Sequence, residues 1–269
     1  MSETRVAVVG GGVVGLCSAY YLRRLGYRVT VIDPDGCDKG CSHGNGGIVV
    51  PSHFVPLASP GTLKLGIKML LDPEGPFGIE GLATPEVLGW VARFVRAANR
   101  EHVKRSGPLL QSLNLASREL YGELQSELGD FGFERKGLLM LCRSSEGYDE
   151  ECELVEPAQR MGLSARPVSK RELAALEPSI ELAAHGGVLF EDDAHLDPAR
   201  FLDRLRQRLV EQQVHFVGGK AASLECSRTV CLATEEGTIE ADWVVLSAGV
   251  WSGEIAKTMS LKLPLLAGK

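Results

Sequence analysis

Long apolar segments are the first feature that this sequence lacks. No apolar run approaches the roughly 18–20 residues that a helix needs to cross a bilayer. The apolar stretch 6–16 is interrupted by Gly10, Gly11 and Gly12 and follows Glu3 and Arg5, which is not the pattern of a secretory signal peptide. The segment "GTLKLGIKMLL" at 61–71 is weakly amphipathic, and a buried helix explains it more simply than a membrane-surface helix. We therefore expect a cytoplasmic protein, at most peripheral at the inner face of a membrane.

The sequence also lacks an excess of positive charge and any closely spaced cysteine pair. Its net charge is −6 and its basic residues are scattered, which argues against a nucleic-acid partner. It has seven cysteines, an odd number, and no C-x-x-C spacing, so we expect reduced thiols and no metal site. Internal repeats and low-complexity tracts are missing as well. The 269 residues, 44% of them hydrophobic, are enough for one large or two modest globular domains.

The hydrophobic patterns predict an α/β protein that opens with a βαβ unit. A buried strand at 5–9 is followed by a helix over 13–26, for which Val14, Ala19, Leu22 and Leu25 would share one face, and by a strand at 27–32. Further helices are expected at 63–71, 85–103, 107–128, 151–161, 169–176 and 198–213, and further strands at 131–142, 188–190, 214–217, 221–226, 229–234, 238–239 and 242–247. The fold class expected is a Rossmann-type FAD-binding domain, a parallel sheet with helices, plus part of an α+β substrate domain. Residues 1–60 and 185–269 would form the first domain, and 61–184 an incomplete substrate or cap region.

The first strand runs into the glycine motif G-x-G-x-x-G, in the stretch "VAVVGGGVVGL". Gly10 permits a tight turn, Gly12 lets the backbone approach a pyrophosphate, and Gly15 lets helix and strand pack closely. The N–H groups at the start of the helix, around Val13 and Val14, would face the phosphates. A turn that uses its glycines only for packing is the alternative.

Asp33 closes the second strand 18 residues after Gly15, where an acid can accept hydrogen bonds from a pair of ribose hydroxyls. An acid at this position argues against NADP, whose 2′-phosphate would need an arginine. The motif alone does not separate NAD from FAD. A regular NAD domain would continue as βαβαβ, whereas this chain breaks into a long stretch rich in Gly, Ser and Pro at 34–62. That stretch favours FAD, whose isoalloxazine lies far from its adenine.

At this point the sequence resembles the FAD-dependent oxidoreductases of the D-amino acid oxidase superfamily, and within it the bacterial D-amino acid dehydrogenases. The resemblance covers nearly the whole chain. The residues that carry it are the βαβ unit with Asp33, "CSHGNGGIVVPSHFVPLASPG" at 41–61, "GGVLFEDDAHLDPARFLDRLRQRL" at 186–209, and the pair "VHFVGGKAASLE" and "ADWVVLSAGVWS" at 214–225 and 241–252.

The resemblance implies further cofactor-binding residues. A loop along the flavin would contain Ser42, Asn45, Gly46 and Gly47, where Gly46 stands in place of the commoner alanine. Ala221 would lie near the adenine, Ala248 and Gly249 near the pyrophosphate, and Trp251 would pack in the core under the cofactor. Family members continue well past Lys269 with the rest of the substrate pocket, so no catalytic residue is assigned from this sequence.

The reaction implied is oxidation of the C–N bond of a D-amino or imino acid to the imine, by hydride transfer to flavin, followed by hydrolysis to a 2-oxo acid. The electron acceptor, a quinone or another carrier, stays open. Two alternatives remain: an inactive FAD-binding fragment or subunit that needs its C-terminal half or a partner, and an NAD-binding module without a redox role. Arg93, Arg96 and Arg100, on one expected helix face, could bind a substrate carboxylate, although a solvated basic stripe is the stronger interpretation.

Two histidines lie near this expected site. His43 stands in the flavin loop, where related amine dehydrogenases attach flavin through a histidine; the alignment puts that position at Gly44, so His43 is expected to line or cap the loop. His195 could face the cleft, but ordering the turn before an N-cap at Asp197 is the simpler interpretation.

Overall fold

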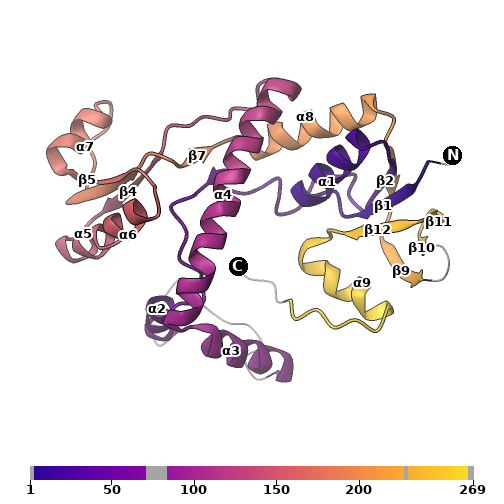
Figure 1. Ribbon diagram of the computed structural model, residues 1–269, viewed down its shortest axis with the longest axis horizontal. Helices are drawn as coiled ribbons and strands as arrows, with labels where there is room; N and C mark the ends of the chain where they lie inside the picture. The colour runs from indigo at the N-terminus through magenta and orange to yellow at the C-terminus, as the bar shows by residue number, and fades with distance from the viewer. Residues whose placement is uncertain (1–2, 71–83, 227–229, 266–269) are drawn as a thin grey trace. The chain divides into compact units, whose positions relative to one another are not determined.

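A computed structural model describes residues 3–70, 84–226 and 230–265. The chain divides into two compact units (Figure 1). The first unit contains Met1–Gly47, Gln125–Phe131 and Asp197–Lys269, and the second unit contains Ile48–Leu124 and Gly132–Leu196. Among the described residues, the helices are all too short or too polar to cross a membrane.

The first unit is built on a parallel sheet with the strand order β12-β1-β2-β8. Its strands are β1 (Arg5–Val9), β2 (Arg28–Asp33), β8 (His215–Gly218) and β12 (Trp243–Leu246). Helix α1 (Val13–Arg24) joins β1 to β2 and packs beside α8 (Pro198–Glu211), as Figure 1 shows. A second, antiparallel sheet has the order β11-β10-β9, from β9 (Ala221–Cys226), β10 (Val230–Thr234) and β11 (Gly237–Ala241). The short helix η1 (Gly249–Trp251) and α9 (Ser252–Thr258) follow β12. The expected βαβ opening and Rossmann-type parallel sheet are therefore confirmed.

The alternation of side chains along the parallel strands gives the first unit two buried layers. On one face, Ala7, Val9 and Ile32 pack with Leu232 of β10 and Ile255 of α9. The large side chains of the two helices are buried as well: Leu16, Tyr20, Phe201, Leu205 and Leu209 are at most 1% exposed. The helix face expected for α1 was wrong in part, because Val14 and Leu25 are 63% and 75% exposed. Val14 lies in the first turn of the helix, and Leu25 is its C-cap, after the last helical residue.

The second unit has an antiparallel sheet with the order β4-β6-β5, from β4 (Leu138–Cys142), β5 (Ala165–Ser169) and β6 (Gly186–Phe190). A two-stranded ladder joins β3 (Ile48–Val49) to β7 (Ala194–His195). The helices are α2 (Pro60–Leu70), α3 (Pro85–Ala97), α4 (Arg100–Leu128), α5 (Ser145–Cys152), α6 (Val155–Arg160) and α7 (Lys170–Leu176). The last four residues of α4 belong to the first unit.

Local capping signals decided several helix ends. Asp197 caps α8 by accepting a hydrogen bond from Arg200 N, with Pro198 in the first turn as expected. Ser169 and Glu172 form the expected capping box of α7. Asn99 accepts a hydrogen bond from His102 N at the start of α4, which separates α4 from α3. The single helix expected over 85–103 was therefore wrong, and Arg100 does not share a helix with Arg93 and Arg96.

The division of the chain also differs from the boundaries expected at residues 60 and 185. Residues 48–60 and 185–196 lie in the second unit, because β6 is the central strand of its sheet and β7 pairs with β3. Residues 125–131 lie in the first unit. There, Glu127 accepts a hydrogen bond from the buried Tyr20 and a salt bridge from Arg24 at 3.0 Å.

Candidate cofactor-binding site

The glycine turn after β1 is closed by the end of β12. Gly10 has a φ of +106°, which favours glycine, and an ideal Cβ built on it would lie 2.5 Å from the carbonyl oxygen of Ser247. A Cβ on Gly15 would lie 1.8 Å from the carbonyl oxygen of Gly10. The Ser247 hydroxyl donates to the carbonyl oxygens of Val9 at 2.9 Å and Gly10 at 3.2 Å. The turn and the close helix–strand packing expected of Gly10 and Gly15 are therefore present, and Ser247 holds them.

The N-terminus of α1 has no acidic partner of its own. Its N-cap is Gly12, which offers no side chain, and the first turn contains no acid. The Ser42 hydroxyl accepts a hydrogen bond from Val13 N at 3.1 Å. An ideal Cβ on Gly12 would lie 2.9 Å from Ser42 Oγ, so Gly12 faces the space beside this hydroxyl. The positive end of a helix dipole, bare glycine backbone and a neutral hydroxyl suit an anion such as a pyrophosphate.

Asp33 binds the backbone of the glycine turn and of the turn that follows β2. Its Oδ2 accepts from Gly11 N at 2.8 Å, and its Oδ1 accepts from Asp35 N and Cys37 N, both at 3.0 Å. A carboxylate has about four acceptor sites, so three are used and one is left for a ribose hydroxyl. A second ribose hydroxyl, as expected from the sequence, would have to replace one of these backbone bonds.

Cys37 is a neighbour of this site that the sequence did not indicate. It is buried and has a φ of +69°. An ideal Cβ on Gly11 would lie 2.1 Å from Cys37 Sγ, so the middle glycine of the turn is required by packing. Burial, and then the charge of Asp33, raises the pKa of the Cys37 thiol to about 12, so this thiol is un-ionised at neutral pH.

The loop after residue 41 is held by its own asparagine. Asn45 Nδ2 donates to the carbonyl oxygens of Cys41 at 3.2 Å and Ser42 at 2.8 Å, and its Oδ1 accepts from Gly47 N at 2.8 Å. Gly47 is buried with a φ of +62°, whereas Gly46 is exposed. Asn45 and Gly47 thus shape the loop, and Ser42 faces the glycine turn.

His43, in the same loop, points toward α8. Its Nε2 lies 3.9 Å from Asp203 Oδ1, too far for a hydrogen bond, and has no hydrogen-bond partner among the described residues. His195 stands in β7 and pairs through its backbone with Ile48 and Glu134. It therefore orders the segment before the Asp197 cap, as the simpler interpretation expected.

The segment after β12 lies beside the glycine turn. A Cβ on Gly10 would be 2.8 Å from the Cα of Ala248, and Gly249 follows with a φ of +55°. Ala221, at the start of β9, is 5% exposed and packs in the core with Ala7, Val9 and Ile32. Trp251 is 52% exposed, so the expectation that it packs in the core was wrong. It is the last residue of η1, which follows β12.

The structure thus gathers most of the expected residues at one edge of the parallel sheet, the edge where β1, β2 and β12 end. All of them belong to the first unit. Bare glycine backbone, a helix N-terminus beside the neutral Ser42 hydroxyl and a carboxylate with one free acceptor site fit the pyrophosphate and ribose of a dinucleotide.

Comparison with known proteins agrees with this geometry. Residues 5–269 match the protein family described as "DAO: FAD dependent oxidoreductase". The chain is 32% identical over 276 residues to a D-amino acid dehydrogenase of Paramagnetospirillum magneticum, a match that covers 98% of this chain and 65% of that protein. It is 29% identical over 273 residues to a D-amino-acid oxidase of Bradyrhizobium diazoefficiens, again over 98% of this chain and 65% of that protein.

The solved structures share the fold at lower identity. Glycine oxidase from Geobacillus kaustophilus superposes with a TM-score of 0.72 at 20% identity, over 97% of this chain and 60% of that chain. The chain therefore spans about two thirds or less of the length of the proteins it matches.

Proposed function

Because this chain belongs to the family of FAD dependent oxidoreductases, with FAD rather than NAD as the cofactor, we propose that it supplies the FAD-binding part of an enzyme that oxidises D-amino acids. The observation that carries the proposal is the glycine turn, with Gly15 packed against Gly10, Ser247 bridging the two strands and Asp33 bonded to Gly11 N.

Each part of this site has a role toward the cofactor. Gly12 and the first N–H groups of α1 would hold the pyrophosphate, because the first turn contains no acid and the side chain beside it, Ser42, is a neutral hydroxyl. The free acceptor site of Asp33 holds a ribose hydroxyl of the adenosine. Ser42, Asn45 and the two glycines after it border the flavin, and Ala248 and Gly249 border the pyrophosphate from the end of β12.

The reaction that we propose is removal of a hydride from the carbon next to the substrate nitrogen. FAD, when bound, supplies the two-electron acceptor that no amino-acid side chain provides. The product imine is hydrolysed by water to a 2-oxo acid and ammonia. The names of the relatives favour amino acids as the substrate class, and D-amino acids in particular. A quinone or another carrier would reoxidise the cofactor.

A reconstitution experiment tests the cofactor site. The chain should bind FAD and gain absorption near ~450 nm, a property of flavin. Gly12→Val should abolish this absorption, because a branched side chain would collide with Ser42 Oγ and occupy the phosphate side of the turn. Gly66→Val in α2 is the matched control, since nothing lies within 4 Å of a Cβ at Gly66 and it is outside the proposed cofactor site. Equal flavin content in both variants would contradict the role given to Gly12.

A second candidate function is an FAD-binding part that is inactive alone. It is favoured by the 65% share of the relatives that this chain spans. A substrate carboxylate needs a cation to bind it and a wall that excludes water, and the residues proposed to hold FAD provide neither. Anaerobic mixing of the FAD-loaded chain with D-alanine or D-proline separates the two candidates. Rapid bleaching by either substrate supports a complete enzyme, and retained FAD without bleaching supports the inactive part.

A further inference from the structure

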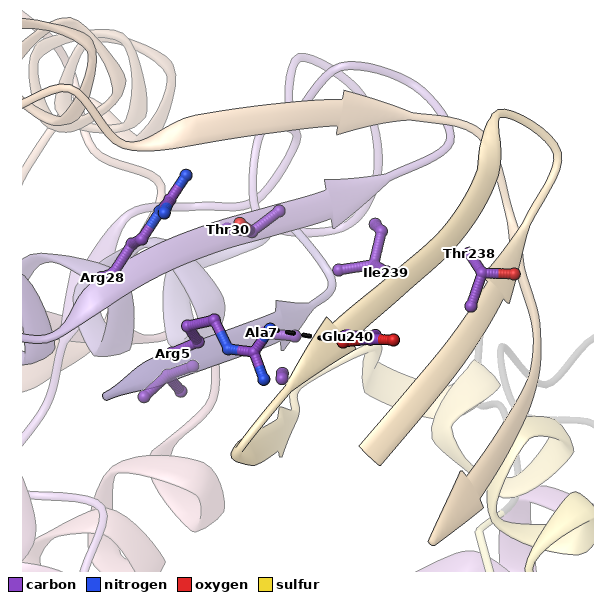
Figure 2. A pocket seen from close by; sticks show the side chains of 9 residues that line it. Arg5, Ala7, Arg28, Thr30, Thr238, Ile239 and Glu240 are labelled. Atoms are coloured by element: carbon purple, nitrogen blue, oxygen red, sulfur yellow. Dashed lines mark hydrogen bonds and ion pairs between the residues drawn. The ribbon is translucent and has the colours of Figure 1, made fainter. Parts of the chain in front are cut away.

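A pocket of about 370 Å³ lies in the first unit, at the edge of the parallel sheet opposite to the glycine turn. It is lined where β1 and β2 begin and by β11, with Arg5, Arg28, Thr30, Ile239 and Glu240 among its residues. Figure 2 shows Arg28 and Thr30 on β2 at one side, and Ile239 and Glu240 on β11 at the other. Arg5 begins β1 and the glycine turn follows its last residue, so at ~3.3 Å per residue roughly 16 Å of strand separates Arg5 from the cofactor site.

Two arginines stand side by side in this pocket with different partners. Arg5 and Arg28 are paired in the register of the parallel strands, so both side chains project from the same face. Arg5 is neutralised by Asp242 at 3.3 Å and by Glu240 at 3.5 Å. The guanidinium of Arg28 makes no hydrogen bond or ion pair with any residue that the structure describes. Arg5 already has its counter-ions, so Arg28 is the arginine of this pocket that can still bind an anion.

The surroundings of Arg28 indicate which anion fits. Thr30 follows two residues along β2 on the same face, and its hydroxyl has no protein partner among the described residues. The half-buried Ile239 provides apolar surface in the same pocket, whereas Ala7, which pairs with Thr30, is fully buried. Glu240 adds a negative charge on the opposite side, which disfavours a ligand with two negative charges.

We propose that this pocket binds the carboxylate of a small organic acid with a single negative charge and a short aliphatic chain. Arg28 holds the carboxylate through its two parallel N–H groups, Thr30 donates a hydroxyl hydrogen bond, and the aliphatic chain packs against Ile239. The site is separate from the glycine turn and does not depend on the proposed oxidation.

Titration of the isotope-labelled 269-residue chain with isobutyrate, followed by NMR at constant ionic strength, tests the proposal. Saturable shifts are expected at Arg28, Thr30 and Ile239. Arg28→Gln should weaken binding by about tenfold or more, and Thr30→Val, which keeps the shape, by about threefold. Arg204→Gln, an exposed arginine on α8, is the matched control and should bind as the unchanged chain does.

Three further ligands sharpen the result. Isobutanol, which has the aliphatic chain without the charge, should give no saturable shift at Arg28. Inorganic phosphate should bind more weakly than isobutyrate. FAD should leave isobutyrate binding unchanged, because it belongs at the other edge of the sheet. The proposal is overturned if isobutyrate causes no saturable shift, if Arg28→Gln binds as well as Arg204→Gln, or if phosphate binds more tightly.

Discussion

Replacement of Gly15 by alanine should destabilise the first unit even without cofactor. The new Cβ would lie 1.8 Å from the carbonyl oxygen of Gly10, which is 1.2 Å short of the 3.0 Å below which real Cβ contacts essentially never occur. The carbonyl oxygen belongs to the backbone and the new Cβ is attached directly to it, so neither atom can rotate away. Helix α1 would have to move off the end of β1. The same Cβ would lie 2.8 Å from Ser247 Oγ, the hydroxyl that bridges Val9 and Gly10.

The expected loss follows from these contacts. Overpacking of a well-packed site costs about 1–3 kcal/mol. Disturbing the two hydrogen bonds of Ser247 adds about 1 kcal/mol. The better helix propensity of alanine returns up to about 1 kcal/mol. We therefore expect a net destabilisation of about 1–3 kcal/mol for Gly15→Ala.

Urea unfolding followed by circular dichroism, with no FAD added, measures this loss. Gly12→Ala is the first comparison, because its Cβ meets only Ser42 Oγ at 2.9 Å, and that side chain can turn away with the loss of one hydrogen bond. That change should cost about 0.5–1.5 kcal/mol. Gly44→Ala, with open space around it, is the control. An unfolding midpoint of Gly15→Ala equal to that of Gly44→Ala would refute the packing role of Gly15.

Substitutions at three further residues test other contacts. Asp33→Ala should weaken FAD binding by about 1.5–3 kcal/mol in a calorimetric titration and also lower the urea midpoint, because this carboxylate accepts three backbone hydrogen bonds; unchanged affinity would move the ribose contact elsewhere. Tyr20→Phe should cost about 1 kcal/mol at pH 7. The Tyr20 hydrogen bond lowers the pKa of Glu127, so this contribution is present above the usual Glu pKa of about 4.3 and is lost as pH falls through the lower folded value; an equal difference between the two proteins at pH 7 and pH 3 would contradict it. Asp193 is fully buried and accepts hydrogen bonds from Ser52 N and Oγ. Burial raises its pKa, so the folded protein should lose stability as pH rises from the usual Asp pKa of about 3.9 through the higher pKa of the folded state. Asp193→Asn should remove that slope, whereas Asp193→Ala should cost about 1–3 kcal/mol by leaving Ser52 without its acceptor; urea midpoints between pH 3 and pH 7 distinguish the two.

Local sequence determined the parts of this protein whose cause is itself local. The strand, the glycines and the acid at Asp33 lie within one βαβ unit, and a positive φ or an N-cap depends on residues only a few positions apart. The capping box of α7 and the Asp197 cap of α8 could be predicted for the same reason. The family resemblance added the loop around Ser42 and Asn45.

Tertiary structure decided what depends on residues far apart in the chain. Ser247 holds the glycine turn from more than 230 positions away, and no local pattern marks that serine. Cys37 fills the space beside Gly11, and Asp33 uses three of its acceptor sites on backbone, which only the packed turn reveals.

The division into units followed the pairing of strands rather than the order of elements. β7 pairs with β3 across some 140 residues, and this takes residues 185–196 into the second unit. The pocket at Arg28 likewise exists only because the register of β1 and β2 sets two arginines side by side and gives Asp242 and Glu240 to one of them. The chemistry of each side chain follows from the sequence. Which side chains are left to bind a ligand is known only once the strands are paired.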